Sequence, residues 1–125
     1  MDQKTVLVVE DETVLRKILE KKLIKEGFTV LSASDGNEAL IIALNKKPHL
    51  ILLDVMMPHN GLLMLQELRK DTAYGKKVPV ILLTNLSPDT KDIVEAIEKH
   101  EPIFYLVKAN YTLEQVVDRV HESLV

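Results

Sequence analysis

Short apolar runs alternate along the chain with segments whose apolar residues recur at helical spacing. The continuous runs cover residues 5–9, 50–53, 78–83 and 103–107, and a weaker run covers 28–33. Runs this short, without polar alternation, are typical of strands buried on both faces of a sheet, and the weaker run fits an edge strand. The pattern therefore predicts five strands.

A helical pattern follows each apolar run. In chain order the five stripes are Leu15, Ile18, Leu19 and Leu23; Ala39, Leu40, Ala43 and Leu44; Leu62, Leu65 and Leu68; Ile93, Ala96 and Ile97; and Leu113, Val116, Val117, Val120 and Leu124. Thr112 and Gln115 have the spacing of a capping box at the start of the last helix. Strands that alternate with helices indicate a parallel sheet, joined by right-handed crossovers and covered on both faces. We expect residues 1–125 to form one such domain.

Composition narrows the class of protein. Apolar residues make up 46% of the 125 residues, which suits a packed core and argues against disorder. The chain has no cysteine, so it has neither a disulfide frame nor a thiolate metal site, and this fits a reducing cytoplasm. The net charge of −3 does not favour a nucleic-acid surface, and no apolar run approaches the roughly 20 residues of a membrane span. We expect a cytoplasmic domain that binds neither nucleic acid nor membrane.

Polar and charged residues stand at the carboxyl ends of the predicted strands. Glu10 and Asp11 follow the first strand, Asp54 the third, Thr84 the fourth and Lys108 the fifth. Parallel strands present their carboxyl ends at one edge of the sheet, where open α/β sheets bind ligands. We therefore expect these five side chains to share that edge.

The residue types at this edge suit phosphoryl transfer. Clustered carboxylates repel one another, and a hard cation such as Mg²⁺, which takes oxygen ligands, relieves the repulsion. A carboxylate can also attack a phosphoryl group and become an aspartyl phosphate, whose formation needs neutralised equatorial oxygens. Asp54 is the best candidate for the nucleophile because it stands alone on the central strand. Thr84 and Lys108 would contact the phosphoryl oxygens.

Five stretches of the chain together resemble the receiver domain of bacterial and archaeal two-component response regulators, including the chemotaxis regulators. They are residues 6–12 (VLVVEDE), 35–40 (DGNEAL), 52–58 (LLDVMMP), 82–84 (LLT) and 104–108 (FYLVK). The resemblance covers the whole chain in the right order. It implies a three-layer, flavodoxin-like (βα)5 doubly wound fold with strand order 2-1-3-4-5.

The resemblance also implies a role for each matching residue. Asp54 is similar to the phosphoaccepting aspartate, Glu10 and Asp11 to the acidic pair that binds Mg²⁺ or Mn²⁺, and Met56 to a metal ligand through its backbone carbonyl. Thr84 and Lys108 resemble the switch hydroxyl and the phosphate-contacting lysine. Tyr105 resembles the aromatic residue that turns inward when the hydroxyl moves toward the phosphate. These are expectations from the family.

Such a domain would act as a switch, not as an enzyme on a separate substrate. A sensor histidine kinase or phosphotransfer protein would phosphorylate it, with the domain catalysing its own phosphorylation and dephosphorylation. The fourth helix, fifth strand and fifth helix would then present an altered face to a downstream protein or to a second copy. An enzyme of the same fold that passes through an aspartyl phosphate is disfavoured, since Met56 stands where such phosphatases carry a second aspartate.

Some positions depart from the family pattern and support an alternative. Gly61 follows Asp54 by seven residues instead of eight, Asn85 is larger than the usual small residue, and Ala109 replaces a proline. Glu101 and Pro102 likewise replace small residues before the fifth strand. The alternative is a pseudo-receiver, an interaction module that works without phosphorylation. The lysine pairs at 21–22, 46–47 and 76–77 are interpreted as solvated faces.

Overall fold

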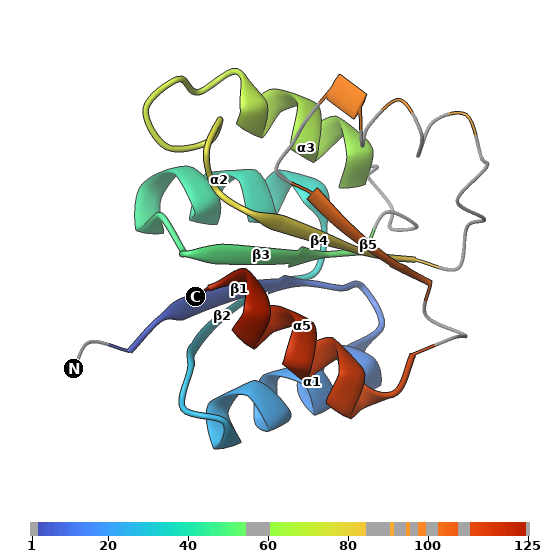
Figure 1. The fold of residues 1–125 in the computed structure, drawn as a ribbon. Helices are drawn as coiled ribbons and strands as arrows, with labels where there is room; N and C mark the ends of the chain where they lie inside the picture. Colours follow the sequence, from blue (N-terminus) through green and yellow to red (C-terminus); the bar gives the residue numbers. More distant parts are fainter. Residues whose placement is uncertain are drawn as a thin grey trace.

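Strands and helices alternate along the chain in the computed structural model (Figure 1), which describes residues 3–54, 61–84, 91, 95, 98–99, 103–107 and 111–124, with only the backbone at 84 and 103–107. The strands are β1 (Thr5–Val9), β2 (Thr29–Ala33), β3 (Leu50–Leu53), β4 (Val80–Thr84) and β5 (Ile103–Val107). The helices are α1 (Thr13–Lys25), α2 (Gly36–Lys46), α3 (Gly61–Arg69) and α5 (Leu113–Ser123). The helix predicted from Ile93, Ala96 and Ile97 falls outside the described residues.

The five strands form one parallel sheet in the order β2-β1-β3-β4-β5. This order confirms the flavodoxin-like arrangement expected from the sequence, with β2 at an edge. The chain moves outward from β1 to β2, then crosses to β3 and continues in the other direction. The strand order therefore reverses between β1 and β3, which is where open α/β sheets bind their ligands.

Alternate residues of the central strands pack against opposite layers of helices. On one face, Leu7, Ile51 and Leu82 belong to a core with the buried residues of α2 and α3. On the other face, Val8, Leu52 and Ile81 belong to a core with the buried residues of α1 and α5. Figure 1 shows these two helix layers above and below the sheet. Both faces of the sheet are thus buried, which is why the strands lack polar alternation.

Two predicted strands begin later than their apolar runs. Phe28 precedes β2, because its backbone N–H donates to the Leu23 carbonyl in the turn after α1. Val78 precedes β4, because its N–H donates to Tyr74 and the next residue, Pro79, has no N–H to give to a neighbouring strand. Both side chains are nonetheless buried, so the apolar pattern identified core positions correctly.

Two residues of the predicted apolar helix stripes are exposed in the structure. Leu19 and Leu23 are buried on α1, whereas Ile18 is 46% exposed; on α2, Leu44 is 38% exposed. Ile18 lines an apolar hollow of about 250 Å³ between α1 and α5, together with Leu15 and Tyr111. The predicted capping box at Thr112 and Gln115 is present, with both reciprocal hydrogen bonds formed.

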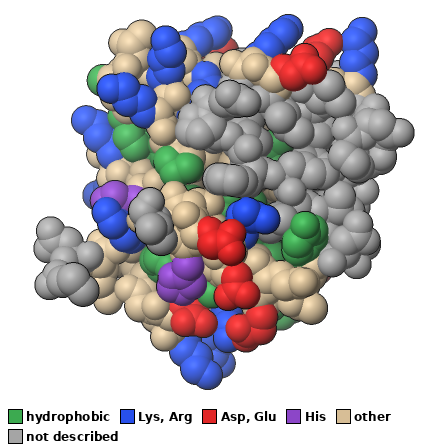
Figure 2. All heavy atoms as spheres, viewed as in Figure 1, with side chains coloured by type: hydrophobic (Ala, Val, Ile, Leu, Met, Phe, Trp, Pro, Cys, Tyr) green, Lys and Arg blue, Asp and Glu red, His purple; other side chains and the backbone are tan. Residues whose placement is uncertain are grey.

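Charged side chains are unevenly distributed over the face of the molecule that Figure 2 draws. Figure 2 shows lysine and arginine gathered along the upper and left margins, over α2, α3 and the ends at which the strands begin. Acidic side chains gather lower in the same view, over α5. In the part of the chain that the structure describes, no helix is long and apolar enough to cross a membrane.

Candidate functional site

The sheet places Glu10 and Asp54 next to each other at its carboxyl edge. Val9 pairs with Leu53 as the last residues of β1 and β3, so the residues that follow them leave adjacent strands together. The backbone continues the strand pairing for one more residue: Asp54 N donates to the Val9 carbonyl at 3.0 Å, and Glu10 N donates to Ala33 at 3.0 Å. The positions of both side chains are therefore fixed by sheet hydrogen bonds.

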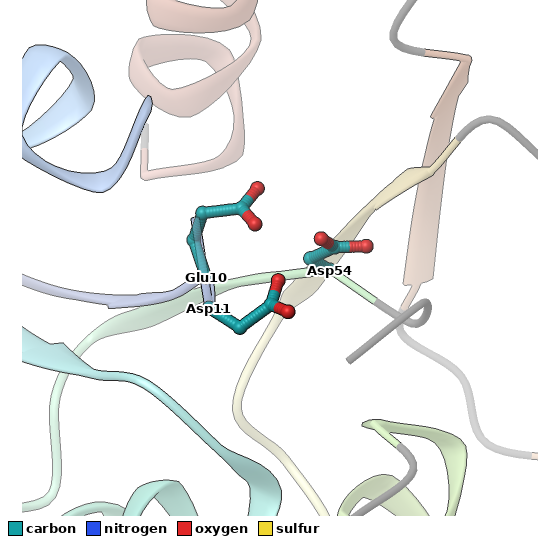
Figure 3. A group of neighbouring side chains, drawn as sticks. All are labelled: Glu10, Asp11 and Asp54. Atoms are coloured by element: carbon teal, nitrogen blue, oxygen red, sulfur yellow. The ribbon is translucent and has the colours of Figure 1, made fainter. Parts of the chain in front are cut away.

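Three carboxylates converge at this edge, as Figure 3 shows: Glu10 and Asp11 from the end of β1 and Asp54 from the end of β3. One oxygen from each lies within 4.8 Å of the others. Glu10 and Asp54 are almost fully buried, at 1% and 3% exposure, while Asp11 is exposed. Carboxylates this close repel one another, and a hard cation would relieve the repulsion, so the grouping is a candidate cation site.

The carboxylate of Glu10 is oriented by the start of α1. Its Oε2 accepts a hydrogen bond from the backbone N–H of Glu12, the residue that caps α1, at 3.2 Å. The partial positive charge at a helix N-terminus favours a carboxylate there. This bond engages one oxygen of Glu10, whose carboxylate lies close to those of Asp11 and Asp54.

Arg16 is a positioning residue that the sequence interpretation missed. Its guanidinium donates to the backbone carbonyl of Glu10 at 2.9 Å and also lies 3.9 Å from the carboxylate of Glu20. It thereby ties the first turns of α1 to the loop that carries Glu10 and Asp11. The sequence signal that could have identified it is a single arginine in the first turns of the helix that follows Glu10 and Asp11.

The other predicted site residues are only partly covered by the described structure. Thr84 is the last residue of β4, beside β3, and pairs with Val107 of β5. Tyr105 lies within β5 and pairs with Leu82. These backbone positions agree with the predicted edge for Thr84 and with a strand position for Tyr105. Met56 and Lys108 lie outside the described residues, as do Asn85 and Ala109. Gly61, the first residue of α3, is buried.

The donor set suits a hard divalent cation. All three groups offer carboxylate oxygens, and they are close enough to surround one ion. Mg²⁺ commonly binds through one or two carboxylates and retains several waters, so the buried Asp54 and the exposed Asp11 suffice as direct ligands. Histidine or cysteine, which softer metals prefer, is absent from this group.

Comparison with known proteins agrees with the fold. The family model for the response regulator receiver domain matches residues 6–121. A probable transcriptional regulator, ycf27, of Porphyridium aerugineum is 43% identical over 78% of this chain. The chain spans only about two fifths of that relative, as the matched part is 39% of its length.

Two solved structures with the same fold are a chemotaxis response regulator and a receiver domain that holds magnesium. The chemotaxis response regulator CheY4 of Vibrio cholerae has a TM-score of 0.85 and 28% identity, covering 98% of this chain and 100% of its own. The receiver domain of sensor histidine kinase PA1611 from Pseudomonas aeruginosa has a TM-score of 0.83 and 24% identity, covering 98% of both chains. That structure holds a magnesium ion coordinated in its active site cleft. The family match over nearly the whole chain, on a sheet of the same order, shows that this chain belongs to the response regulator receiver domain family.

Proposed function

We propose that this chain is a phosphorylation-controlled switch in which Asp54 accepts a phosphoryl group from a phosphohistidine. The observation that carries the proposal is the convergence of Glu10, Asp11 and Asp54 within 4.8 Å at the carboxyl edge of a receiver fold. The donor would be a sensor histidine kinase or a phosphotransfer protein. In the transfer, a carboxylate oxygen of Asp54 forms a bond to phosphorus while the phosphorus–nitrogen bond to the imidazole breaks.

Asp54 is the nucleophile that the geometry favours. It follows β3 directly, its backbone is held by the Val9 carbonyl, and its side chain is 3% exposed. A fixed nucleophile needs little reorganisation to reach an incoming phosphorus atom. Of the other two carboxylates, Glu10 is engaged with the start of α1 and Asp11 is exposed. These two are better suited to holding a cation beside the nucleophile.

Glu10, Asp11 and Asp54 would hold Mg²⁺ or Mn²⁺, and the backbone carbonyl of Met56 would complete the protein ligands. The ion would neutralise the negative charge that builds up on the phosphoryl oxygens. The protein's own contribution is to keep the carboxylates converged: the sheet fixes Asp54, and Glu12 N–H and Arg16 fix the Glu10 segment. The same edge would catalyse hydrolysis of the aspartyl phosphate, so the domain would be a self-acting switch with no separate substrate.

Thr84, Lys108 and Tyr105 would transmit the phosphorylated state. Thr84, at the end of β4 next to β3, and Lys108, the residue after β5, would contact the phosphoryl group. Movement of Thr84 toward the phosphate would allow Tyr105 to turn inward. This would change the face that the predicted fourth helix, β5 and α5 would form, which would bind a downstream protein or a second copy of the chain.

Residues 1–125 would form one receiver domain acting in the cytoplasm. Because the chain matches less than half of its curated relatives, their transcriptional role is a possible context for this domain in a longer regulator, not an activity of the domain itself.

The proposal is tested by incubating the protein with acetyl phosphate, with Mg²⁺ or with EDTA, and measuring the intact mass. One phosphoryl group should be added in Mg²⁺, and none in EDTA or in the Asp54→Ala variant. Titration with Mg²⁺ alone separates metal binding from phosphorylation. The matched control is Asp118→Ala, an exposed aspartate on α5, which should be phosphorylated like the wild type.

Two negative results would have different meanings. Absence of both Mg²⁺ binding and phosphorylation would contradict the proposal and favour an interaction module that works without phosphate. Mg²⁺ binding without phosphorylation would contradict the phosphoacceptor role while retaining the metal site, and Asn85→Ala would then test whether the larger side chain blocks the edge.

A further inference from the structure

A second hollow lies at the opposite end of the sheet, where the strands begin. It has a volume of about 410 Å³ and is lined by Lys47, Pro48, His49, Ala73, Tyr74, Lys77 and Val78. These residues come from two segments that are distant in sequence: the turn between α2 and β3, and the turn between α3 and β4. The hollow thus brings together Lys47 and Lys77, one lysine from each of two pairs that the sequence alone presented as unrelated solvated faces.

The wall formed by residues 71–78 is held in place by hydrogen bonds. The Asp71 carboxylate accepts from the backbone N–H groups of Tyr74 and Gly75, at 3.1 and 2.7 Å. From the other side, the Arg69 guanidinium donates to the carbonyls of Gly75 and Val78, both at 2.7 Å. Gly75 is required here, because a Cβ would lie 2.0 Å from the Leu68 carbonyl oxygen. This wall is therefore preorganised.

The two walls are joined through Tyr74. Its hydroxyl donates to the carbonyl of Pro48, and burial raises the pKa of this phenol, so the phenol remains a donor. On the other wall, Lys47 ends α2 with φ of 51°, a left-handed conformation that non-glycine residues adopt uncommonly. The shape of the hollow is thus fixed on both sides by the chain's own contacts.

The charged groups that line the hollow are donors. Lys47 and Lys77 are exposed, and neither forms a salt bridge with any residue in the described ranges. His49 accepts the backbone N–H of Thr5 at its Nδ1, at 2.9 Å, so a neutral imidazole carries its proton on Nε2 and can donate there. Asp71 lies within electrostatic range of Lys47, but its carboxylate is engaged by the turn.

We propose that this hollow binds a small organic phosphate, whose phosphate oxygens accept from Lys47, Lys77 and His49 while its carbon skeleton packs on Pro48, Ala73 and Val78. The lining combines positively charged donors with apolar side chains, and its volume lies in the range of small-molecule sites. An inorganic phosphate alone would leave the apolar part of the hollow uncovered. The site is at the far end of the sheet from Asp54, so it does not depend on the proposed phosphorylation.

The test uses NMR of the ¹⁵N-labelled protein in EDTA, so that no cation draws a phosphate to the acidic edge. The probes are ADP, inorganic phosphate, adenosine and an acidic peptide. ADP should shift the backbone amides of residues 47, 49 and 73–78, with a Kd of roughly 0.1–1 mM. Inorganic phosphate should bind more weakly, and adenosine, which lacks the anion, should shift these amides little.

Variants separate a shaped site from general attraction to lysines. Lys47→Gln with Lys77→Gln should weaken ADP binding by about tenfold or more, because two charged donors are lost. The matched control, Lys17→Gln with Lys21→Gln on α1, removes the same charge and should leave binding unchanged. Ala73→Leu fills the hollow without changing charge and should also abolish the shifts, whereas Asp54→Asn should not affect them.

Three results would overturn the proposal. One is the absence of ADP-dependent shifts in these amides at roughly ten millimolar ADP, far above the expected Kd. Another is equal ADP binding by the wild type and a folded Ala73→Leu variant, which would indicate diffuse attraction to surface lysines. The third is binding of an acidic peptide but not ADP, which would assign the surface to a protein partner.

Discussion

Replacing Asp54 with asparagine should stabilise the protein in the absence of Mg²⁺, although the substitution removes a buried carboxylate. The carboxylates of Glu10, Asp11 and Asp54 lie within 4.8 Å of one another. At that distance two unit charges repel by about 3.5 kcal/mol at an effective dielectric constant of 20 and about 0.9 kcal/mol at that of water. Asparagine keeps the shape of the side chain and removes the charge.

The burial of each carboxylate decides which of these two repulsion energies applies to it. Glu10 and Asp54 are both buried, so their repulsion lies toward the larger value. Asp11 is exposed, so its repulsion with Asp54 lies near the smaller one. After the loss of hydrogen bonds that the charged form makes, we expect a net gain of about 1–3 kcal/mol in the free energy of unfolding.

The assay is urea unfolding in EDTA and again in Mg²⁺. In EDTA the Asp54→Asn variant should unfold at a higher urea concentration than the wild type. Mg²⁺ at ten times its Kd should stabilise the wild type by about 1.4 kcal/mol, since it binds only the folded state, and should have little effect on the variant. Asp118→Asn, which removes an exposed carboxylate elsewhere, is the control and should respond to Mg²⁺ like the wild type. A variant that is less stable than the wild type in EDTA and is still stabilised by Mg²⁺ would refute the electrostatic reasoning.

Three further predictions concern turns and a helix cap that stabilise the fold. Hydrogen bonds from the backbone N–H of Gly75 and, to a lesser extent, of Tyr74 lower the pKa of Asp71, so the contribution of Asp71 to stability is present above the unfolded pKa of 3.8 and is lost as pH falls through the folded pKa. Asp71→Asn should therefore reduce the difference in the free energy of unfolding between pH 7 and roughly pH 3, measured by urea unfolding. An unchanged difference would contradict this. Gly75→Ala should lower the free energy of unfolding by about 1–3 kcal/mol or more, because the new Cβ would lie 2.0 Å from the Leu68 carbonyl oxygen. Gly27→Ala meets no atom but has a φ of 97°, so it should lower the free energy of unfolding by about 1–2 kcal/mol through backbone strain alone. Negligible losses in both variants would show that the chain relaxes at both sites. Thr112→Ala should cost about 1 kcal/mol in thermal or urea unfolding by removing the capping box of α5, and no change would mean that solvent replaces the cap.

The sheet was predictable because its strands are buried on both faces. Continuous apolar runs identify such strands, and their alternation with helical stripes implies a parallel sheet, which the structure confirms. The order of the strands was implied by the family resemblance and not by the alternation. The bounds were less predictable, because backbone hydrogen bonds of turns decide where a strand begins. Phe28 and Val78 are apolar and buried, yet their N–H groups serve the preceding turns, so neither belongs to a strand.

The acidic cluster was also predictable, for a topological reason. Residues that directly follow neighbouring parallel strands must lie close together, and this placed Glu10 and Asp11 beside Asp54. Contacts between side chains and loop backbone carry no such periodic signal. The Arg16 bond to the Glu10 carbonyl and the Tyr74 bond to Pro48 depend on how turns approach one another in space. For the same reason the convergence of Lys47 and Lys77 on one hollow could not be seen in the sequence.

The central claim is that Asp54 itself carries the phosphoryl group. The most direct measurement is to phosphorylate the protein with acetyl phosphate and Mg²⁺, digest it, and locate the added phosphoryl group by tandem mass spectrometry at acidic pH, where the acyl phosphate survives best. The account predicts a single modified peptide with the phosphoryl group on Asp54, absent when EDTA replaces Mg²⁺. A phosphoryl group on Asp11 or on any other residue, or an unmodified Asp54 in protein that binds Mg²⁺, would contradict it.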